Sequence, residues 1–436
     1  MNIAFIVCGL PGIGYHGGAM TCWSIIQAMR GRGHAVCVVS LFDTSDRNPY
    51  RDFKQAQANA LKEAGVEVRF IDHDSRLLRR RLEGNGLSRV IKGLSLFFSP
   101  TVEKFFYWAC LSSEVARVLE DIKPDAIFCY HFDALSAVYN TKIAPFMAGV
   151  GDLWHLPMKF RWGLKRPSLK KYFVDGPYVF AVSRAAKKCM TKMLKPCIRK
   201  GAFAAHYAQW LKQEAGISDA LYLRTPIHDP VGQRWSELRS QHSKKLKPRI
   251  LLMGDLETTS TLAGLRSFLY EILPKLEDVF GEEGFEVRIV GGGNPEPDMA
   301  RKLERPAIQL QGRVIPPDKE FLSADLLLVP TPISLGIRVR IITAFSFGTP
   351  VVTHSANTLG IPEIYHNQNA LVADKVEEIA GYVIQLIKDE QLNRTIGENG
   401  RKTYEQFFLE NVAANRIVDE IEHMVSGKYT LVLKNN

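Results

Sequence analysis

The chain of 436 residues is 46% hydrophobic and 23% charged, a composition typical of folded globular proteins and not of disordered ones. Its length predicts two domains, because a single hydrophobic core rarely grows beyond about 250–300 residues. No apolar run approaches the ~20 residues that a membrane-spanning helix needs. The N-terminal sequence also lacks the basic region and cleavage site of a signal peptide, so we expect a cytoplasmic protein.

Charge is distributed unevenly along the chain. The net charge is +10, made of +14 over residues 1–240 and −4 over residues 241–436. A basic N-terminal half predicts an anionic partner: a nucleic acid, a membrane surface or an acidic substrate. No nucleic-acid-binding motif accompanies the charge, which disfavours RNA or DNA. The seven cysteines contain no C-x-x-C pair, so we expect reduced core cysteines, no metal and no bound cofactor.

The N-terminal half alternates short apolar runs with helical patterns. A helical stripe over residues 20–30 ends at Gly31, and glycine suits the end of a helix. Repeated strand–helix–strand units predict a doubly wound parallel sheet, whose strands are buried on both faces. The predicted strands cover residues 2–8, 36–41, 66–71, 126–130, 148–153 and 179–183.

The same alternation starts again after a polar and basic segment, residues 233–248, which we interpret as the linker between two domains. We therefore predict an N-terminal domain over 1–235, a second domain over 245–408, and a C-terminal helix with a tail over 409–436. Both domains are expected to be α/β. The predicted strands of the second domain cover residues 249–253, 287–290, 308–311, 326–329 and 351–353.

The segment over residues 330–352 carries the strongest functional signal. It follows an apolar strand, and Gly336 opens a turn that holds Arg338 and Arg340 at the start of a predicted helix. Backbone N–H groups at a helix start attract anions, and guanidinium groups fit a phosphate or a carboxylate. The alternative is that the two arginines form surface ion pairs. We favour anion binding, because both arginines lie beside the glycine turn.

Other glycine turns follow predicted strands. Gly17 and Gly18 lie between the first strand and the first helix, where they allow a substrate to approach the backbone. Gly254 and Gly291 end two strands of the second half, at the edge where open α/β sheets bind ligands. Thr261 belongs to a run of hydroxyl residues after Gly254, and a helix N-cap explains one such hydroxyl but not the whole run.

The Gly17-Gly18 loop, residues 330–352 and the G-I-P-E-I sequence over 360–364 together resemble the retaining nucleotide-sugar glycosyltransferases of the GT-B fold, family 4 type. The resemblance implies an α/β fold of two facing Rossmann-like, doubly wound parallel-sheet domains. The first would bind the acceptor and the second the donor, and a C-terminal helix would pack back on the first. It also implies metal-independent transfer of a sugar with retention of configuration.

The resemblance also implies candidate site residues. At the end of the fifth predicted strand the family has a histidine that contacts the donor sugar, and this chain has Gly151. The nearby candidates for catalysis are Asp152 and His155, for which a structural role is the alternative. The acceptor loop would contain Gly17 and Gly18. The donor site would contain Gly254, Thr261, Gly291, Gly336, Arg338, Arg340, Thr343 and Glu363, the last of which has a second interpretation as a helix cap.

The chain departs from the family at the charged positions of the donor site. Asp255 and Ala263 stand where the family has an arginine and a lysine, and Thr343 stands where it has a ribose-binding glutamate. Fewer positive charges favour a donor with a single phosphate, such as a CMP-activated acidic sugar. The same losses favour an alternative, a catalytically inactive subunit that binds glycan or stabilises a partner glycosyltransferase.

Two basic and aromatic stretches fit an anionic membrane surface, although a solvated helix face has the same composition. One contains Arg76, Arg79, Arg80 and Arg81, and the other runs over residues 159–172. We therefore predict an enzyme of surface polysaccharide or lipopolysaccharide synthesis that is cytoplasmic and peripheral on the inner face of the membrane. Its substrates would be a nucleotide-sugar donor and a glycan or glycolipid acceptor.

Overall fold

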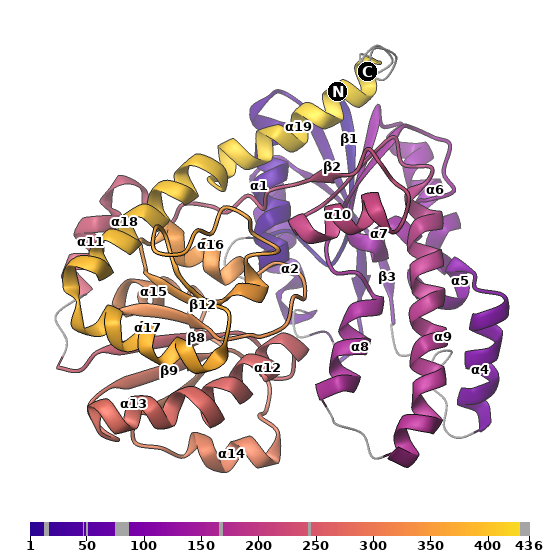
Figure 1. The fold of residues 1–436 in the computed structure, drawn as a ribbon. Coiled ribbons are helices and arrows are strands. Elements are labelled where there is room, and N and C mark those ends of the chain that lie inside the picture. The colour runs from indigo at the N-terminus through magenta and orange to yellow at the C-terminus, as the bar shows by residue number, and fades with distance from the viewer. Residues whose placement is uncertain are drawn as a thin grey trace. The chain divides into compact units, whose positions relative to one another are not determined.

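The computed structural model describes residues 1–12, 17–46, 48, 51–74, 87–164, 169–242 and 246–427. The chain divides into two compact units (Figure 1). The first unit is formed by Met1–Arg224 together with Ala413–Asn436, and the second by Thr225–Val412. Each unit is an α/β layer structure around its own parallel sheet, and the prediction of two doubly wound parallel sheets is confirmed.

The sheet of the first unit has seven parallel strands in the order β3-β2-β1-β4-β5-β6-β7. The order reverses between β1 and β4, which are hydrogen-bonded neighbours. Ligands bind open α/β sheets at such a reversal, beyond the carboxyl ends of the strands. The strands are β1 (Asn2–Cys8), β2 (Ala35–Asp43), β3 (Glu67–His73), β4 (Ala126–Tyr130), β5 (Phe146–Val150), β6 (Arg199–Ala202) and β7 (Leu221–Tyr222).

Helices flank this sheet, and the last of them, α19, comes from the C-terminal part of the chain (Figure 1). Ile417 and Ile421 of α19 join the buried core of the first unit, and Arg32 pairs with Asp419 at 2.5 Å. The helices of this unit are α1 (Gly17–Gly31), α2 (Lys54–Glu63), α4 (Leu87–Phe98), α5 (Val102–Phe105), α6 (Ser112–Ile122), α7 (His131–Ser136), α8 (His155–Leu164), α9 (Leu169–Leu194), α10 (Ala205–Gln213) and α19 (Glu410–Ser426).

The sheet of the second unit has six parallel strands in the order β10-β9-β8-β11-β12-β13. The predicted strands of this half are confirmed, and β13 is a further strand at the edge that we did not predict. Its residues Leu371, Val372 and Ala373 pair with β12. The strands are β8 (Arg249–Met253), β9 (Glu286–Val290), β10 (Ile308–Gly312), β11 (Leu326–Val329), β12 (Val351–His354) and β13 (Leu371–Ala373).

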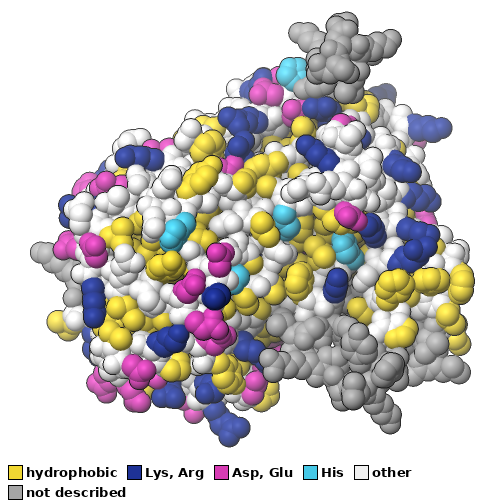
Figure 2. All heavy atoms as spheres, viewed as in Figure 1, with side chains coloured by type: hydrophobic (Ala, Val, Ile, Leu, Met, Phe, Trp, Pro, Cys, Tyr) yellow, Lys and Arg dark blue, Asp and Glu magenta, His cyan; other side chains and the backbone are white. Residues whose placement is uncertain are grey.

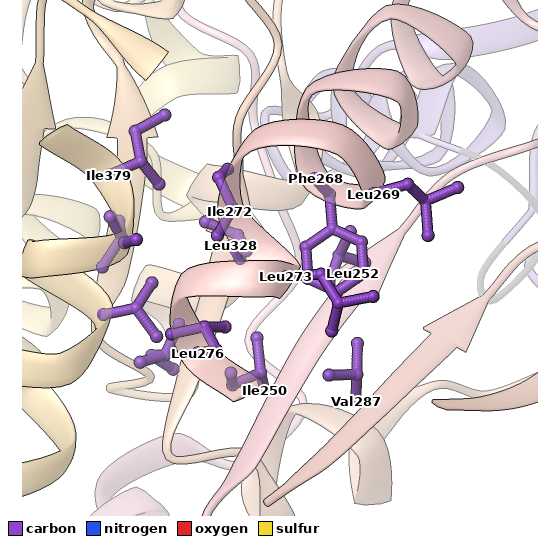
Figure 3. Close-up of a cluster of buried hydrophobic side chains, with 14 of the residues drawn as sticks. Ile250, Leu252, Phe268, Leu269, Ile272, Leu273, Leu276, Val287, Leu328 and Ile379 are labelled. Atoms are coloured by element: carbon purple, nitrogen blue, oxygen red, sulfur yellow. The ribbon is translucent and has the colours of Figure 1, made fainter. Parts of the chain in front are cut away.

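One face of this sheet packs against apolar helices to form the core shown in Figure 3. Phe268, Ile272 and Leu276 come from the helical segment after α12 and meet Ile250 and Leu252 of β8. The helices of the second unit are α11 (Trp235–His242), α12 (Thr259–Ser267), α13 (Leu273–Phe280), α14 (Pro297–Leu303), α15 (Asp318–Ser323), α16 (Val339–Ser346), α17 (Val376–Lys388) and α18 (Glu390–Phe407).

The chain divides between Arg224 and Thr225, and not within the predicted linker over 233–248. The residues after the division are fastened to α18 of the second unit. The Tyr404 hydroxyl donates to the carbonyl of Ile227 at 2.9 Å, and the buried Arg401 pairs with Asp229 at 2.5 Å. Much of the predicted linker is helix α11. The polar and basic composition of this segment gave no sign of the contacts that it makes in the folded unit.

The run over 179–183, predicted as a strand, lies within helix α9, and that prediction was wrong. Buried side chains recur every four residues from within this run to the residues after it, at Ala181, Ala185, Cys189 and Met193. A short apolar window inside a long amphipathic helix has the composition of a strand, so it misled us. The sixth strand of the sheet is instead β6.

No helix in the described part of the chain is both long and apolar enough to cross a membrane. The seven cysteines form no disulfide with one another: five are buried, Cys8 is partly buried and Cys110 is exposed. Burial raises the pKa of the Cys22 and Cys129 thiols well above the usual value, so these two stay protonated and behave as small apolar side chains.

Candidate functional site

Two glycine turns lie side by side at the carboxyl edge of the second sheet. Gly254 follows β8 with a φ of +144°, and its N–H donates to the carbonyl of Val290 at 2.9 Å. A Cβ added to Gly291, which follows β9, would lie 1.9 Å from the Gly254 carbonyl oxygen. The two turns therefore pack backbone against backbone, which a side chain at Gly291 would prevent.

Arg340 and Thr261 occupy the space in front of Gly254. A Cβ added to Gly254 would lie 2.4 Å from Arg340 Nη1 and 2.4 Å from Thr261 Oγ1. Thr261 belongs to α12, and its hydroxyl oxygen lies 2.9 Å from that of Thr258. Arg340 lies in the first turn of α16. A guanidinium group, hydroxyl groups and an exposed backbone turn thus converge at one point of the sheet edge.

The guanidinium of Arg340 has little electrostatic compensation. Its Nη1 donates to the carbonyl of Met253, and its buried Nε has no hydrogen-bond partner. No carboxylate of the described residues lies within ion-pair distance of it, although the residue as a whole is partly exposed. Burial, with a smaller contribution from Arg338, lowers the pKa of Arg340 to about 9. A cation in such surroundings is a strong site for an anion.

Arg338 has a different environment from Arg340. Its side chain is buried, with the residue 8% exposed, and it donates to Asn357 Oδ1 at 3.1 Å. It also donates to the carbonyls of Ile333 and Leu335, the former at 3.3 Å. These bonds hold the loop that precedes α16 in place. The prediction that Arg338 binds an anion directly stays a prediction, since its contacts are those of a loop-positioning residue.

Arg313 is a cation of this edge that the sequence analysis missed. Its Nη2 lies 4.0 Å from Asp255 Oδ2, and a Cβ on Gly292 would lie 3.1 Å from the same Nη2. The signal was available, because Gly312-Arg313 comes directly at the end of a predicted strand. Asp255 lies within ion-pair distance of Arg313 and offsets part of its charge, whereas Arg340 has no carboxylate partner among the described residues.

The other predicted donor-site residues lie around this edge. The Thr343 hydroxyl donates to the carbonyl of Val339 at 3.1 Å within α16. Gly336 adopts a φ of +67° in the turn before α16, which favours glycine. Glu363 is buried in a turn, and no helix follows it until Val376, so its interpretation as a helix cap was wrong. The backbone carbonyl of Glu363 accepts from Asn369 at 2.8 Å.

At the carboxyl edge of the first sheet, Gly17 and Gly18 are the first residues of α1. The Thr21 hydroxyl donates back to the Gly17 carbonyl at 2.8 Å. Residues 13–16 of the predicted acceptor loop lie outside the described residues. The sequence placed the glycine pair in a loop before the helix, whereas the structure makes it the first two residues of α1. The contact of the pair with an acceptor stays a prediction.

Gly151 follows β5, and its missing side chain has a specific neighbour. A Cβ added to Gly151 would lie 1.8 Å from His131 Cε1. His131 follows β4, the strand that pairs with β5, and it adopts a φ of +69°. Asp152, a predicted catalytic residue, is exposed just after Gly151. His131 was missed in the sequence because its relation to Gly151 exists only across two strands.

His155, the second predicted catalytic residue, begins α8. Its ring lies 5.1 Å from that of Trp210, between ring centroids, and its Nδ1 is buried with no hydrogen-bond partner. Burial, followed by the charges of Lys187 and Lys159, lowers the pKa of His155 to about 4. The lowered pKa favours the neutral imidazole, and the catalytic role predicted for His155 stays a prediction.

The described residues contain no group of three or more His, Cys, Asp or Glu side chains that could hold a metal ion. Residues 247–389 match the model of a family described as Glycosyl transferases group 1. No curated protein sequence matches the chain. The matched segment contains both glycine turns, α12 and the α16 region, so it includes the whole edge on which Arg340 lies.

Solved structures of the same fold align over nearly the whole chain. Sucrose-phosphate synthase from Thermosynechococcus elongatus gives a TM-score of 0.66 at 11% identity, over 98% of this chain and 99% of its own. HepE from Anabaena, in complex with UDP and glucose, gives 0.64 at 15%, over 96% and 98%. WaaG, a glycosyltransferase involved in lipopolysaccharide biosynthesis, gives 0.60 at 14%, over 96% and 99%. At these identities the likeness establishes the fold, and the predicted GT-B architecture is confirmed.

Proposed function

We propose that this chain, whose residues 247–389 match the model of the glycosyl transferases group 1 family, moves a sugar from a nucleotide-sugar donor to a glycan or glycolipid acceptor. One observation carries the proposal: Arg340, beside a backbone turn and the Thr261 hydroxyl, is a desolvated cation without a carboxylate partner in the described residues. A phosphate group satisfies such a site, because it brings negative charge and several hydrogen-bond acceptors.

The chemistry follows from where charge develops. As the bond between sugar and phosphate breaks, negative charge grows on the leaving nucleotide, and preorganised donors lower the energy of that state. Arg340 is held in place by its bond to the Met253 carbonyl, so it needs no reorganisation when the charge appears. We propose retention of configuration and independence from metal ions as part of the same function.

The balance of charge at this edge supports a donor with a single phosphate. Asp255 offsets part of the charge of Arg313, and Arg338 is already bonded to Asn357 and to loop carbonyls, so Arg340 is the guanidinium that we assign to the phosphate. A CMP-activated acidic sugar carries one phosphate, whereas the UDP and GDP sugars carry two. We therefore propose CMP as the nucleotide, and tighter binding of UDP than of CMP would contradict this choice.

We also propose that the protein binds an anionic membrane surface and acts there in surface polysaccharide or lipopolysaccharide synthesis. Arg76, and the arginines over 79–81, lie outside the described residues. Within the described part, α4 and α9 expose the apolar patch at the right of Figure 2, made of Ile91, Leu94, Phe98 and Phe180. Exposed apolar residues on a basic protein suit an anionic bilayer interface. Equal sedimentation with phosphatidylglycerol and phosphatidylcholine vesicles would count against this part.

Calorimetry with UDP, GDP, TDP and CMP tests the donor site. We expect one nucleotide to bind, and Arg340→Ala to weaken it roughly 10–100-fold, because a charge-assisted hydrogen bond to phosphate is lost. Arg394→Ala is the matched control, since Arg394 is an exposed arginine of the same unit whose ion pair with Glu390 is on the surface. Equal binding by all three proteins would place the nucleotide elsewhere.

A specific observation keeps the alternative of an inactive subunit in view. Thr343 stands where the family has a glutamate, and its hydroxyl donates a hydrogen bond to the Val339 carbonyl within α16. Failure of every nucleotide to bind the wild-type protein would favour a subunit that binds glycan or stabilises a partner glycosyltransferase.

A further inference from the structure

The chain passes between the two units twice, and the two connections are paired with each other. It leaves the first unit after Arg224 and returns to it after Val412. The backbone N–H of Ile227 donates to the carbonyl of Phe408 at 2.9 Å, and Ile227 forms an isolated parallel bridge with Leu409. The paired segments both belong to the second unit. The outgoing and the returning chain are therefore joined within a few residues of both connections.

A side-chain pair joins the same two segments. His228 Nδ1 lies 3.0 Å from Glu410 Oε1, and the two residues are 182 positions apart in the sequence. The His228 side chain is 37% exposed and that of Glu410 is 30% exposed, so water reaches the pair. Glu410 is the first residue of α19, the helix that continues into the first unit. The pair therefore fastens the outgoing segment to the start of the returning helix.

The groups around His228 favour its protonated form. The hydrogen bond with Glu410 raises the pKa of His228 above its usual value, and burial opposes this rise. The charges of Glu410, Asp229 and Asp318, the last at the start of α15, act in the same direction as the hydrogen bond. Asp229 also accepts from Arg401 of α18, so part of its charge is already neutralised. A partly exposed imidazole beside a carboxylate titrates close to neutral pH.

We propose that His228 and Glu410 form a proton-controlled clasp, which holds the two connections together when the imidazole is protonated and weakens when the proton leaves. A hydrogen bond between ionised groups is about twice as strong as one between neutral groups. Because the pKa of His228 is raised in the folded chain, the clasp contributes stability below about pH 6.5 and loses it as the pH rises through the raised pKa. The clasp goes beyond the proposed function, since it does not depend on which substrate the protein takes.

Native-state hydrogen exchange of the full chain measures the clasp at one backbone bond. The Ile227 N–H, bonded to the Phe408 carbonyl, exchanges when the two segments separate, so its protection factor reports how often they do. We expect this factor, corrected for the intrinsic exchange rate, to fall about three- to tenfold from pH 6 to pH 8.5. The Val287 N–H, bonded to the Ala307 carbonyl within the second sheet, is the internal reference for global unfolding.

Three variants assign the pH effect to its groups. His228→Gln keeps a side chain that can donate a hydrogen bond but cannot titrate, so Ile227 should have the same protection at both pH values, near the wild-type level at pH 8.5. Glu410→Gln removes the charge that stabilises the imidazolium, so the fall in protection between pH 6 and pH 8.5 should shrink or disappear. His423→Gln is the matched control, because it removes an exposed imidazole from the same helix as Glu410 and should behave as wild type.

An NMR titration of the His228 imidazole is an independent measurement. We expect its midpoint in the wild-type protein to lie above the usual pKa of about 6.5. In Glu410→Gln we expect a lower midpoint, because the neutral amide no longer favours the charged imidazole. The wild-type protein alone is sufficient for both measurements, so the test does not depend on any variant folding.

Three results would overturn the clasp. The first is a protection factor of Ile227 that, relative to Val287, changes less than about twofold from pH 6 to pH 8.5 in the wild-type protein. The second is a fall of wild-type size in His228→Gln, which would place the titrating group elsewhere. The third is a wild-type titration midpoint of His228 at or below the usual value. Neither measurement uses a nucleotide, so failure of the clasp and failure of the proposed donor site are separate outcomes.

Discussion

The carboxyl edges of the two sheets are built alike in backbone and differently in side-chain chemistry. In each, a glycine at the end of a strand leaves its Cβ position to a polar side chain from a neighbouring element: Arg340 at Gly254, and His131 at Gly151. At the second sheet the cost is electrostatic, because a cation is desolvated. At the first sheet the cost is conformational, because a histidine adopts a left-handed φ.

The difference teaches what each edge is suited to bind. A desolvated guanidinium favours a charged ligand, since only an opposite charge offsets its burial. An imidazole held by backbone strain favours a neutral hydroxyl, for which geometry matters more than charge. The comparison holds only if Arg340 is costly to the empty protein and if the glycines are required.

The largest expected effect contrasts two arginines of the second unit. Arg401 pairs with Asp229 and Glu405, whereas Arg340 has no carboxylate among the described residues. We expect Arg401→Met to lower the free energy of unfolding by about 3–5 kcal/mol, because Asp229 loses its partner while largely buried. We expect Arg340→Met to leave it unchanged or to raise it, as measured by urea unfolding without nucleotide. Similar losses in both variants would end the claim that Arg340 is uncompensated.

A second contrast concerns two glycines of the second unit. Gly254→Ala places a Cβ 2.4 Å from both Arg340 Nη1 and Thr261 Oγ1 at a φ of +144°. We expect a loss of about 1–3 kcal/mol in stability, together with loss of nucleotide binding. Gly381→Ala is the control, because no atom lies within 4 Å of its added Cβ in helix α17. It is expected to gain about 0.5–1 kcal/mol and to bind nucleotide normally.

Urea unfolding and calorimetry measure both effects on the same preparations. Retention of nucleotide affinity by Gly254→Ala would show that Arg340 is free to move aside, and the close approach of turn and guanidinium would then have no functional meaning.

The smallest expected effect concerns pH and the first unit. The pKa of His155, about 4, lies below the usual value, so the unfolded chain binds a proton first as the pH falls. The stability that neutral His155 contributes is thus present above about pH 6.5 and is lost as the pH falls towards 4. Allowing for solvent screening of the partly exposed ring, the loss is up to about 2 kcal/mol. Urea unfolding of the wild type and His155→Phe between pH 7 and pH 4 measures it.

His155→Phe keeps a ring against Trp210 and cannot titrate, so it is the control for the wild-type protein. Parallel stability curves for the two proteins would mean that His155 has the same pKa in the folded and in the unfolded chain.

Much of the fold was predictable because buried parallel strands leave a local signal. The strands from Arg249–Met253 to Val351–His354 were found as apolar runs bounded by glycine turns. Predictions failed where local composition had two solutions. Residues 179–183 have the composition of a strand when they are taken alone, but they belong to the long helix α9. The basic 233–248 segment has the composition of a linker, but much of it forms helix α11.

The candidate donor site was predictable in part. Arg338 and Arg340 were identified from one contiguous motif, but the sequence assigned them one role, and the structure separates them. Arg338 donates to Asn357 and to loop carbonyls, whereas Arg340 lies against Gly254. The arrangement depends on residues 86 positions apart, and no local pattern records it.

The sequence by itself determined that this protein has two parallel α/β sheets with glycine turns at strand ends, because burial periodicity and turn chemistry act over a few neighbouring residues. Only the tertiary structure decided which side chains those glycines admit: Arg340 and Thr261 at Gly254, and His131 at Gly151. The reason is physical. A glycine leaves space where a Cβ would be, but it does not determine which side chain fills that space. The side chain depends on which strands and helices the fold places next to the glycine.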